Sequence, residues 1–272
     1  MTGLAFSQRL EQAERAANVE LVEARAQLFP ESSACWIEVA GARAMFDGSG
    51  SPITQSFGLG LCTMPTAADM DCLEAFFHSR GAPAIHEVSP LAPREMLPLL
   101  SERGYRPVEL TDIMFLPLAE LAPAPPANPA VTVRLISPDE QELWAATGAE
   151  GWRGQTEFAS LISTLMRIFA ARPGALSFLA EKDGLAIAAG GLFLHQGVAL
   201  LAGASTIPEH RRQGAQRALF QARLRHAAEA GADICMIGTE PGSESQRNAA
   251  YYGFRVAYTR IKWMLPLPEA VS

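Results

Sequence analysis

Apolar and polar positions alternate most regularly in the second half of the chain. Between residues 131 and 267, short apolar segments of strand length are separated by longer segments in which apolar side chains recur every three or four residues. The predicted strands lie in 131–138, 175–184, 185–197, 198–208, 232–240 and 254–265, and the predicted helices in 138–152, 157–174 and 212–230. This order, with an antiparallel meander followed by strand–helix–strand–helix–strand, predicts an α/β fold built on a mixed sheet.

The first half has a less regular pattern but is compatible with the same fold. Residues 33–50 and 51–62 are expected to be long strands joined at the DGSGSP turn, and 66–81 a helix capped by Thr66. From the meander onward the order of these elements follows that of the second half.

A repeat relates the two halves. Gly104–Leu118 (GYRPVELTDIMFLPL) and Gly253–Leu267 (GFRVAYTRIKWMLPL) both start with glycine, an aromatic residue and arginine, and both end in LPL. The segments before them, 79–90 and 229–241, each combine a helix end at a glycine with a short apolar strand. Two copies of one fold explain the match economically, and chance similarity of two helix–strand corners is the alternative.

A proline-rich segment separates the copies. Residues 119–130 (AELAPAPPANPA) contain four prolines and are predicted to be a linker. The expected domains are therefore 1–118 and 131–272, and 272 residues are enough for two cores.

Composition narrows the functional classes. The net charge of −7 argues against a protein whose main ligand is nucleic acid. The four cysteines form no CxxC pair, so no metal site is expected, and free thiols are the simplest interpretation. Neither a signal peptide nor a membrane span is predicted, which favours the cytoplasm.

Candidate chemistry is concentrated where the helix at 212–230 begins. This helix has an apolar face formed by Ala215, Ala218, Leu219 and Ala222. The preceding strand ends at Pro208, which leaves no room for a long loop. The first N–H groups of such a helix have no partner within it and, with Arg211, Arg212 and Gly214 beside them, suit an anion such as a pyrophosphate. Arginines that are merely solvated are the alternative.

The same residues resemble a known family. The segment PEHRRQGAQRALFQARL is similar to motif A of the GNAT superfamily of acetyl-CoA-dependent N-acetyltransferases, in which Arg or Gln, two residues, Gly, one residue and Gly or Ala follow one another. Arg211 and Gly214 fit this motif, whereas Gln216 departs from it. Residues 243–264 are similar to the next segment of the family, so the resemblance covers the whole second half.

The resemblance implies a fold of two tandem GNAT-like domains and a ligand, acetyl-CoA, bound by the second without any metal. The implied cofactor-binding residues are Ser205, Thr206 and Ile207 for the pantetheine arm, Arg211, Arg212, Gln213, Gly214, Ala215, Gln216 and Arg217 for the pyrophosphate, and Ser245 and Asn248 further along. In the first half Asp69 and Asp71 stand where the loop would be, so domain 1–118 is expected to bind no cofactor.

Candidates for the catalytic acid, the catalytic base and the acceptor site lie outside this loop. The family often places a tyrosine four residues before the Gly-Phe glycine, but Ala249 stands there, which leaves Tyr252 as a candidate acid or as a core aromatic. Glu240 is the candidate base. Glu150, Trp152 and Glu157 are expected to line the acceptor site, with surface acids and packed aromatics as the alternative.

The predicted function is acetyl transfer to a small-molecule amine or a protein amino group, by direct attack in a ternary complex. A catalytically silent module that binds CoA or a partner is the alternative. Transfer of an amino acid from aminoacyl-tRNA is a third hypothesis, which the net charge of −7 disfavours. No nucleic-acid or membrane partner is expected, and the chain is expected to be a monomer or homodimer.

Overall fold

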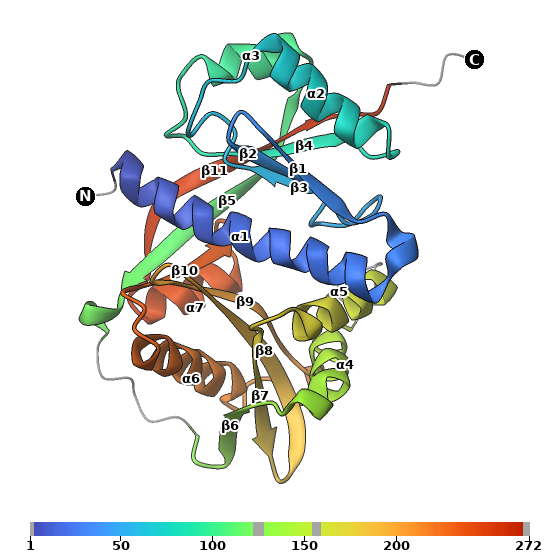
Figure 1. Cartoon of the computed structure of the whole chain (residues 1–272). Coiled ribbons are helices and arrows are strands. Elements are labelled where there is room, and N and C mark those ends of the chain that lie inside the picture. The colour runs from blue at the N-terminus through green and yellow to red at the C-terminus, as the bar shows by residue number, and fades with distance from the viewer. Residues whose placement is uncertain (1–2, 122–127, 154–158, 269–272) are drawn as a thin grey trace. The chain divides into compact units, whose positions relative to one another are not determined.

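The computed structural model describes residues 3–121, 128–153 and 159–268. The chain folds into two compact units. The first unit consists of Met1–Met114, Gly238–Tyr251 and Arg255–Ser272. The second unit consists of Phe115–Ile237 and Tyr252–Phe254. Figure 1 shows the elements along the chain.

The first unit is a mixed sheet with helices. Its strands follow the order β1-β2-β3-β4-β11-β5. They are β1 (Cys35–Val39), β2 (Ala42–Phe46), β3 (Gln55–Phe57), β4 (Ala84–Val88), β11 (Arg255–Leu265) and β5 (Arg106–Pro117), whose last three residues belong to the second unit. Its helices are α1 (Leu4–Leu28), α2 (Ala67–His78), α3 (Met96–Glu102) and α7 (Glu244–Tyr251). Strand β3 runs parallel to β4, and β11 antiparallel to β4.

Two buried regions stabilise this unit. An apolar core joins β2 and β4 to α2 and α3, with Phe77, Leu100 and Trp263 among its members. A charged cluster centres on Arg260 of β11, whose side chain is 1% exposed and lies within 4 Å of carboxylates of Glu11, Glu14 and Glu87. Burial raises the pKa of Glu11, against the lowering effect of Arg260.

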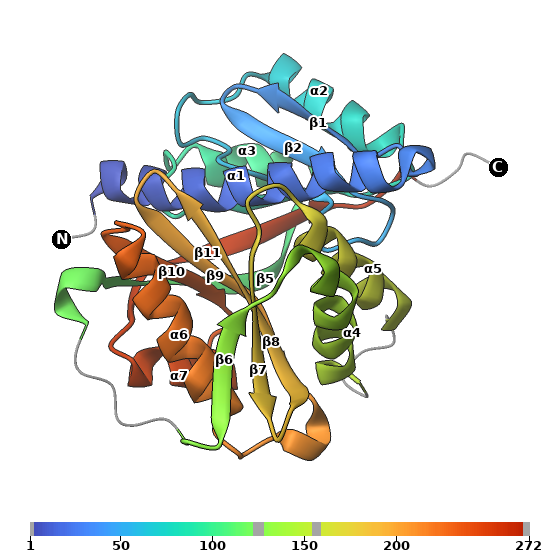
Figure 2. The same cartoon turned by 60° about the horizontal axis from the view of Figure 1, so that its bottom comes forward.

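The second unit contains the order β10-β9-β8-β7-β6. Its strands are β6 (Val131–Leu135), β7 (Leu176–Lys182), β8 (Leu185–His195), β9 (Val198–Thr206) and β10 (Ile234–Thr239), whose last two residues belong to the first unit. Strands β6 to β9 are antiparallel, and β10 is parallel to β9. The helices α4 (Gln141–Gly151) and α5 (Ala159–Ala171) lie on one side of β6–β9 and α6 (Ala215–Glu229) on the other (Figure 2).

The predicted α/β fold with a mixed sheet is confirmed, and so are the strands and helices expected in the second half. Two expectations in the first half are wrong. Residues 33–50 are not one strand but a hairpin that turns at Ala40 and Gly41, both with positive φ, and 51–62 contains only the short β3.

A 3-10 turn (Leu118–Glu120) overlaps the start of the expected linker 119–130, of which residues 122–127 lie outside the described part. The proposed division into domains 1–118 and 131–272 stays a prediction. The compact units divide the chain along other lines, because β11 belongs to the first.

None of the helices in the described part of the chain has both the length and the apolar character needed to cross a membrane. In the same residues, no group of three or more His, Cys, Asp or Glu side chains is arranged to hold a metal ion.

Candidate active site

The candidate site begins where β9 and β10 stop pairing. The last paired residues are Leu200 and Met236, but β9 continues to Thr206. A β-bulge interrupts the β8–β9 register in the same stretch, and Gly203 there has a φ of 60°. Main-chain groups of β9 beyond Leu200 therefore have no partner in β10, which leaves that edge of the strand open to an extended ligand.

The loop after β9 presents a series of main-chain donors. Pro208–His210 is a 3-10 turn, Arg212 has a φ of 61°, and Gly214 is the N-cap of α6 with a φ of 93°. No side chain caps this helix. Within the described residues, none of the five consecutive N–H groups from Arg212 to Gln216 has a hydrogen-bond partner. Such a set of amides at a helix N-terminus binds anions.

Glycine is needed at 214 for two reasons. The positive φ is unfavourable for any residue with a β-carbon. A β-carbon at this position would also lie 3.1 Å from Cβ of Asn128. Asn128 fixes the loop further, because its Nδ2 donates to the carbonyl of Gln213 at 2.9 Å.

The two motif arginines have different surroundings. Arg211 donates from Nε to the carbonyl of Thr206 (3.3 Å) and from Nη2 to that of Gly151 (3.0 Å), so it joins the loop to β9 and to the end of α4. Arg212 is exposed and has no side-chain partner in the described part of the chain. Arg217 is exposed on the first turn of α6, next to the buried Ala218.

Other predicted cofactor residues have side chains that hold the protein together. Ser205 donates to the carbonyl of Gly148 at 2.7 Å, and Gln216 Nε2 donates to Oγ1 of Thr206 at 3.0 Å. The N–H of Ile207 donates to the carbonyl of Ile187, and Ala215 is buried. What β9 can offer a ligand is therefore its main chain, as the resemblance implies.

The helix α4 ends directly against this strand. A β-carbon on Gly151 would lie 2.3 Å from Oγ of Ser205, so only glycine permits the approach. Beyond it, Glu150 and Trp152 line one hollow of about 360 Å³, together with Ala146, Ala149, Arg153, Ile162 and Ser163. Two of the three predicted acceptor residues thus share a cavity, whereas Glu157 lies outside the described residues.

Arg153 connects the hollow to the loop. Its guanidinium pairs with Glu150 at 2.7 Å and with Glu209 of the 3-10 turn. A main-chain hydrogen bond and the charge of Arg153 lower the pKa of Glu209, which stays ionised at neutral pH.

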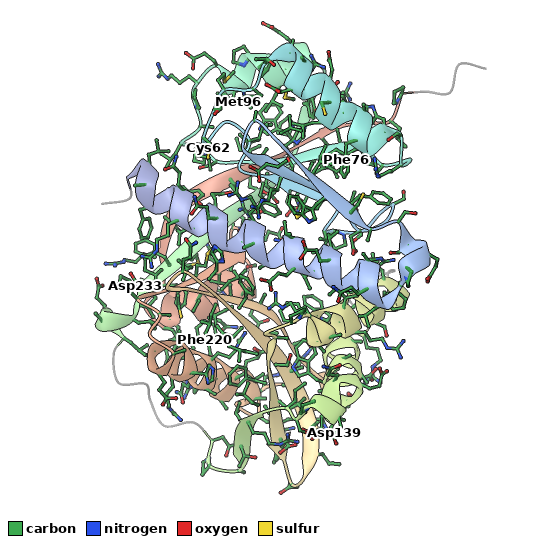
Figure 3. The ribbon with its side chains drawn as sticks, viewed as in Figure 1. Cys62, Phe76, Met96, Asp139, Phe220 and Asp233 are labelled. Atoms are coloured by element: carbon green, nitrogen blue, oxygen red, sulfur yellow. The ribbon has the colours of Figure 1, made fainter. Side chains whose placement is uncertain are left out.

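The remaining candidates are distributed over both units. Glu240, Ser245 and Asn248 are exposed residues of the first unit, the latter two on α7. Tyr252 belongs to the second unit, where its ring stacks on Phe220 with centroids 4.5 Å apart and its hydroxyl donates to the carbonyl of Arg217 at 3.4 Å. Figure 3 labels Phe220 on α6. Ala249, at the tyrosine position of the motif, is fully buried.

In the first unit the helix start at the corresponding place, that of α2, is capped by its own side chains. Thr66 accepts from the N–H of Asp69, and the Asp69 carboxylate accepts from the N–H of Thr66, so α2 has a complete capping box. This hydrogen bonding lowers the pKa of Asp69. Asp71 pairs with Arg103.

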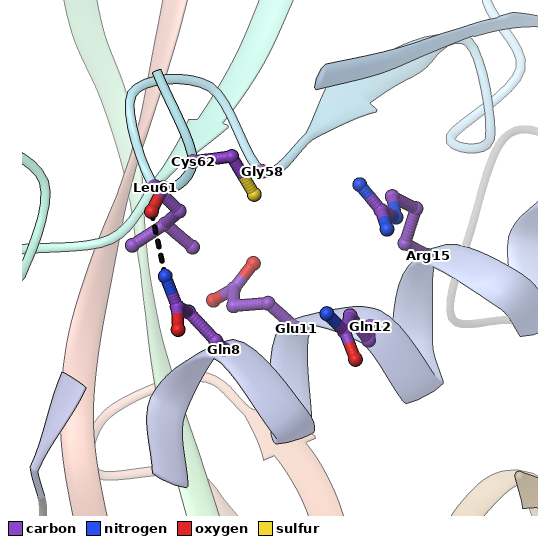
Figure 4. Close-up of a pocket in the computed structure, with 7 residues that line it drawn as sticks. All are labelled: Gln8, Glu11, Gln12, Arg15, Gly58, Leu61 and Cys62. Atoms are coloured by element: carbon purple, nitrogen blue, oxygen red, sulfur yellow. Dashed lines mark hydrogen bonds between the residues drawn. The ribbon is translucent and has the colours of Figure 1, made fainter. Parts of the chain in front are cut away.

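The loop between β3 and α2 also lies against α1. Gln8, Glu11, Gln12 and Arg15 project from α1 toward Gly58, Leu61 and Cys62 (Figure 4), and Gln8 Nε2 donates to the carbonyl of Leu61 at 2.8 Å. The cavity left between them is about 10 Å³, the size of one water molecule. At the start of α2 the N–H groups of Thr66 and Asp69 thus have side-chain partners, whereas the N–H groups from Arg212 to Gln216 have none in the described part of the chain.

Two residues near the loop could not be anticipated from the sequence. Lys182 at the end of β7 donates from Nζ to Oε1 of Gln213 at 2.8 Å, and Asn128 packs beside Gly214. Both reach the loop from distant positions in the chain. The only signal in the sequence is that Lys182 is one of two lysines in an arginine-rich chain.

Comparison with known proteins supports an acetyltransferase fold. Residues 131–244 match the family model described as acetyltransferase (GNAT) domain. No curated protein matches the chain.

Solved structures are similar over most of the chain. One is a GCN5-related N-acetyltransferase from Kribbella flavida, with a TM-score of 0.65 and 19% identity over 92% of this chain and 96% of that one. Another is a tandem GNAT protein from the clavulanic acid biosynthesis pathway, with a TM-score of 0.58 and 16% identity over 85% and 80% of the two chains. A GCN5-related N-acetyltransferase from Sphaerobacter thermophilus matches with a TM-score of 0.53 and 18% identity over 70% and 62%. At these identities the likeness concerns the fold.

Proposed function

We propose that the protein transfers an acetyl group from acetyl-CoA to an amine, because residues 131–244 match the family model of the GNAT acetyltransferase domain. The observation that carries this proposal is the set of five unpartnered N–H groups from Arg212 to Gln216, next to the exposed guanidinium of Arg212. These groups suit the pyrophosphate of coenzyme A. The open edge of β9 beyond Leu200 suits the amide groups of its pantetheine arm.

Acetyl-CoA would supply a thioester with a thiolate leaving group of moderate pKa. The protein's part is to orient an amine, remove its proton and stabilise the oxyanion that forms. An amine with a pKa of about 10.4 is neutral in roughly one molecule per thousand at pH 7, so a base is required. We assign that role to Glu240, acting directly or through water.

The oxyanion needs a fixed donor, and the main chain of β9 at the Gly203 bulge is the proposed source. Glu150 and Trp152 are proposed to bind the acceptor in the hollow at the end of α4, with Glu157 as a further candidate. Ser245 and Asn248 are proposed to contact the CoA arm, and Tyr252 is the proposed acid. The hydroxyl of Tyr252 would have to leave the carbonyl of Arg217 to serve.

The test combines a thiol-release screen with a binding measurement. Acetyl-CoA is offered with a panel of small amines and lysine peptides, and free CoA is measured. In parallel, acetyl-CoA binding is measured by calorimetry for Gly214→Glu and for Gly231→Glu. Gly231 follows the other end of α6, has a φ of 80°, and has nothing within 4 Å of where a β-carbon would be. Gly231→Glu therefore introduces the same kind of backbone strain as Gly214→Glu but leaves the loop before α6 unchanged.

We expect Gly214→Glu to weaken acetyl-CoA binding by about two orders of magnitude, because it places a negatively charged side chain in the proposed anion site. Gly231→Glu should bind acetyl-CoA normally. Equal binding by both variants would refute the placement of the diphosphate. Stabilisation by acetyl-CoA, with no release of free coenzyme A in the presence of any of the amines, would instead support a silent CoA-binding module. The buried Ala249 at the tyrosine position is the observation that favours that second candidate.

A further inference from the structure

A lysine from a different strand stands beside the proposed diphosphate loop. Lys182 ends β7, and its Nζ lies 2.8 Å from the side-chain oxygen of Gln213, the residue before Gly214. An ammonium has three donors, and one of them is used by this contact. The other two are available on the side of a loop whose main-chain donors are already unpartnered.

The charge of Lys182 is not neutralised by a carboxylate among the residues that the structure describes. Its neighbour Glu181 pairs with Arg134 at 2.7 Å, and Arg134 also binds Glu140 at 2.6 Å. Arg153 and Arg167 in the same unit likewise have carboxylate partners. A half-buried ammonium held by a neutral amide, in a chain of net charge −7, is therefore placed to meet an anionic ligand.

Coenzyme A has two separate phosphate groups, a diphosphate and a ribose 3′-phosphate. The five amides from Arg212 to Gln216 suit the diphosphate. The side chain of Gln213 projects from this row to the ammonium, so Lys182 stands to one side of it. A compact point charge at that position suits the second, separate phosphate.

We propose that Lys182 binds the ribose 3′-phosphate of coenzyme A and that Gln213 positions its ammonium. This inference rests on the proposed function, since it assumes that the diphosphate occupies the amides. It adds a selectivity: the site distinguishes coenzyme A from 3′-dephospho-coenzyme A.

The experiment is calorimetric binding of coenzyme A and of 3′-dephospho-coenzyme A to the full chain and to three variants. Lys182→Met removes the charge and retains the aliphatic stem, and Lys182→Arg retains the charge. Arg225→Met is the matched control, because it removes one exposed positive charge from α6 about ten residues, roughly 15 Å along the helix, beyond its start.

The native protein should bind coenzyme A about tenfold more tightly than the dephospho form. In Lys182→Met the affinity for coenzyme A should fall about tenfold while the dephospho form binds unchanged, so that the preference disappears. Lys182→Arg should keep most of the preference, and Arg225→Met all of it. An unchanged unfolding midpoint in Lys182→Met would exclude a merely structural effect.

Three results would overturn the inference alone. They are equal binding of both nucleotides by the native protein, an equal loss for both in Lys182→Met, and no loss in that variant. An equal loss would assign Lys182 to the diphosphate or to the loop. If the native protein bound neither nucleotide, the proposed function itself would fail, and the two failures are thus distinguishable.

Discussion

At the scale of single residues, the loop before α6 contains two kinds of group. Some side chains hold the loop in its conformation, and other groups remain available to bind a ligand. Arg211 donates to the carbonyls of Thr206 and Gly151, and Gln216 to the hydroxyl of Thr206. Arg212 and the main-chain amides are the groups without partners in the described structure. The two adjacent arginines of the motif therefore have different expected roles, one in holding the loop and one in binding.

This difference predicts opposite behaviour of two single substitutions. Arg211→Met should lower the free energy of unfolding by about 1 to 2 kcal/mol, because two carbonyls lose a charged donor. Arg212→Met should leave stability unchanged and weaken acetyl-CoA binding several-fold, more so at low salt. Urea unfolding and calorimetry at two salt concentrations measure both effects. An unstable Arg212→Met with normal binding would reverse the assignment.

A buried histidine in the first unit predicts how stability depends on pH. His86 is fully buried between Ser56 Oγ (2.6 Å from Nδ1) and Tyr105 Oη (2.9 Å from Nε2), and burial lowers its pKa to about 3. In the unfolded chain its pKa is about 6.5. Between these values the unfolded state binds a proton that the folded state does not, so stability is full above pH 6.5 and falls as the pH drops toward 3.

The loss attributable to His86 should reach about 2 to 3 kcal/mol at pH 4.5. His86→Gln should therefore unfold more easily than the native protein at pH 7, yet lose less stability on going to pH 4.5. Urea unfolding at both pH values gives the comparison, with His210→Gln as a control outside the buried core. Parallel pH dependence of the native protein and His86→Gln would show that His86 does not titrate in this way.

At the scale of elements, the end of α4 and the loop before α6 are linked. Gly148 and Gly151 contact Ser205, and Arg153 pairs with Glu209 as well as Glu150. The hollow proposed for the acceptor and the loop proposed for the cofactor are thus built on one connected set of residues. Occupation of one should affect the other.

A double-mutant cycle with Arg153→Gln and Glu209→Gln measures this link. Because both side chains are well exposed, the coupling should be modest, about two- to fivefold in acetyl-CoA affinity or in the KM of the acceptor. The double variant should lose less than the product of the two single losses. Strictly multiplicative effects would mean that the ion pair carries no coupling.

The elements that were predictable are those whose signals are local. The helix 215–229 and its glycine cap follow from the apolar stripe and from Gly214. The β1–β2 hairpin was missed because its turn, Ala40–Gly41, is not marked by polar residues, and α1 because charged side chains interrupt its apolar face. Lys182 and Asn128 belong to the loop only through the tertiary fold, so no local pattern indicated them.

At the scale of the whole molecule, sequence order and compact units differ. The repeat suggested that residues 253–267 complete the second half, but β11 pairs with β4, Leu265 opposite Ala84 and Ile261 opposite Val88. Its Trp263 lies in the core with α2, and its Arg260 lies among Glu11, Glu14 and Glu87. A strand that is last in the chain is thus part of the unit that begins it.

This arrangement predicts that the chain cannot be divided at the linker. A fragment of residues 131–272 would keep β11 but lose β4 and α1, which exposes Trp263 and leaves Arg260 without its three carboxylates. Removing the partners of a buried charge typically costs about 3 to 5 kcal/mol, a large part of the stability of a domain. We expect the fragment to aggregate, and co-expression with residues 1–130 to restore a soluble complex that unfolds in a single transition.

The comparison uses soluble yield, circular dichroism and size-exclusion chromatography. Introducing Arg260→Met into the co-expressed 131–272 fragment should not reproduce this rescue, because the buried Glu11 and Glu87 would then lose the charge of Arg260. A soluble, cooperatively folded 131–272 fragment on its own would show that β11 does not need the first unit.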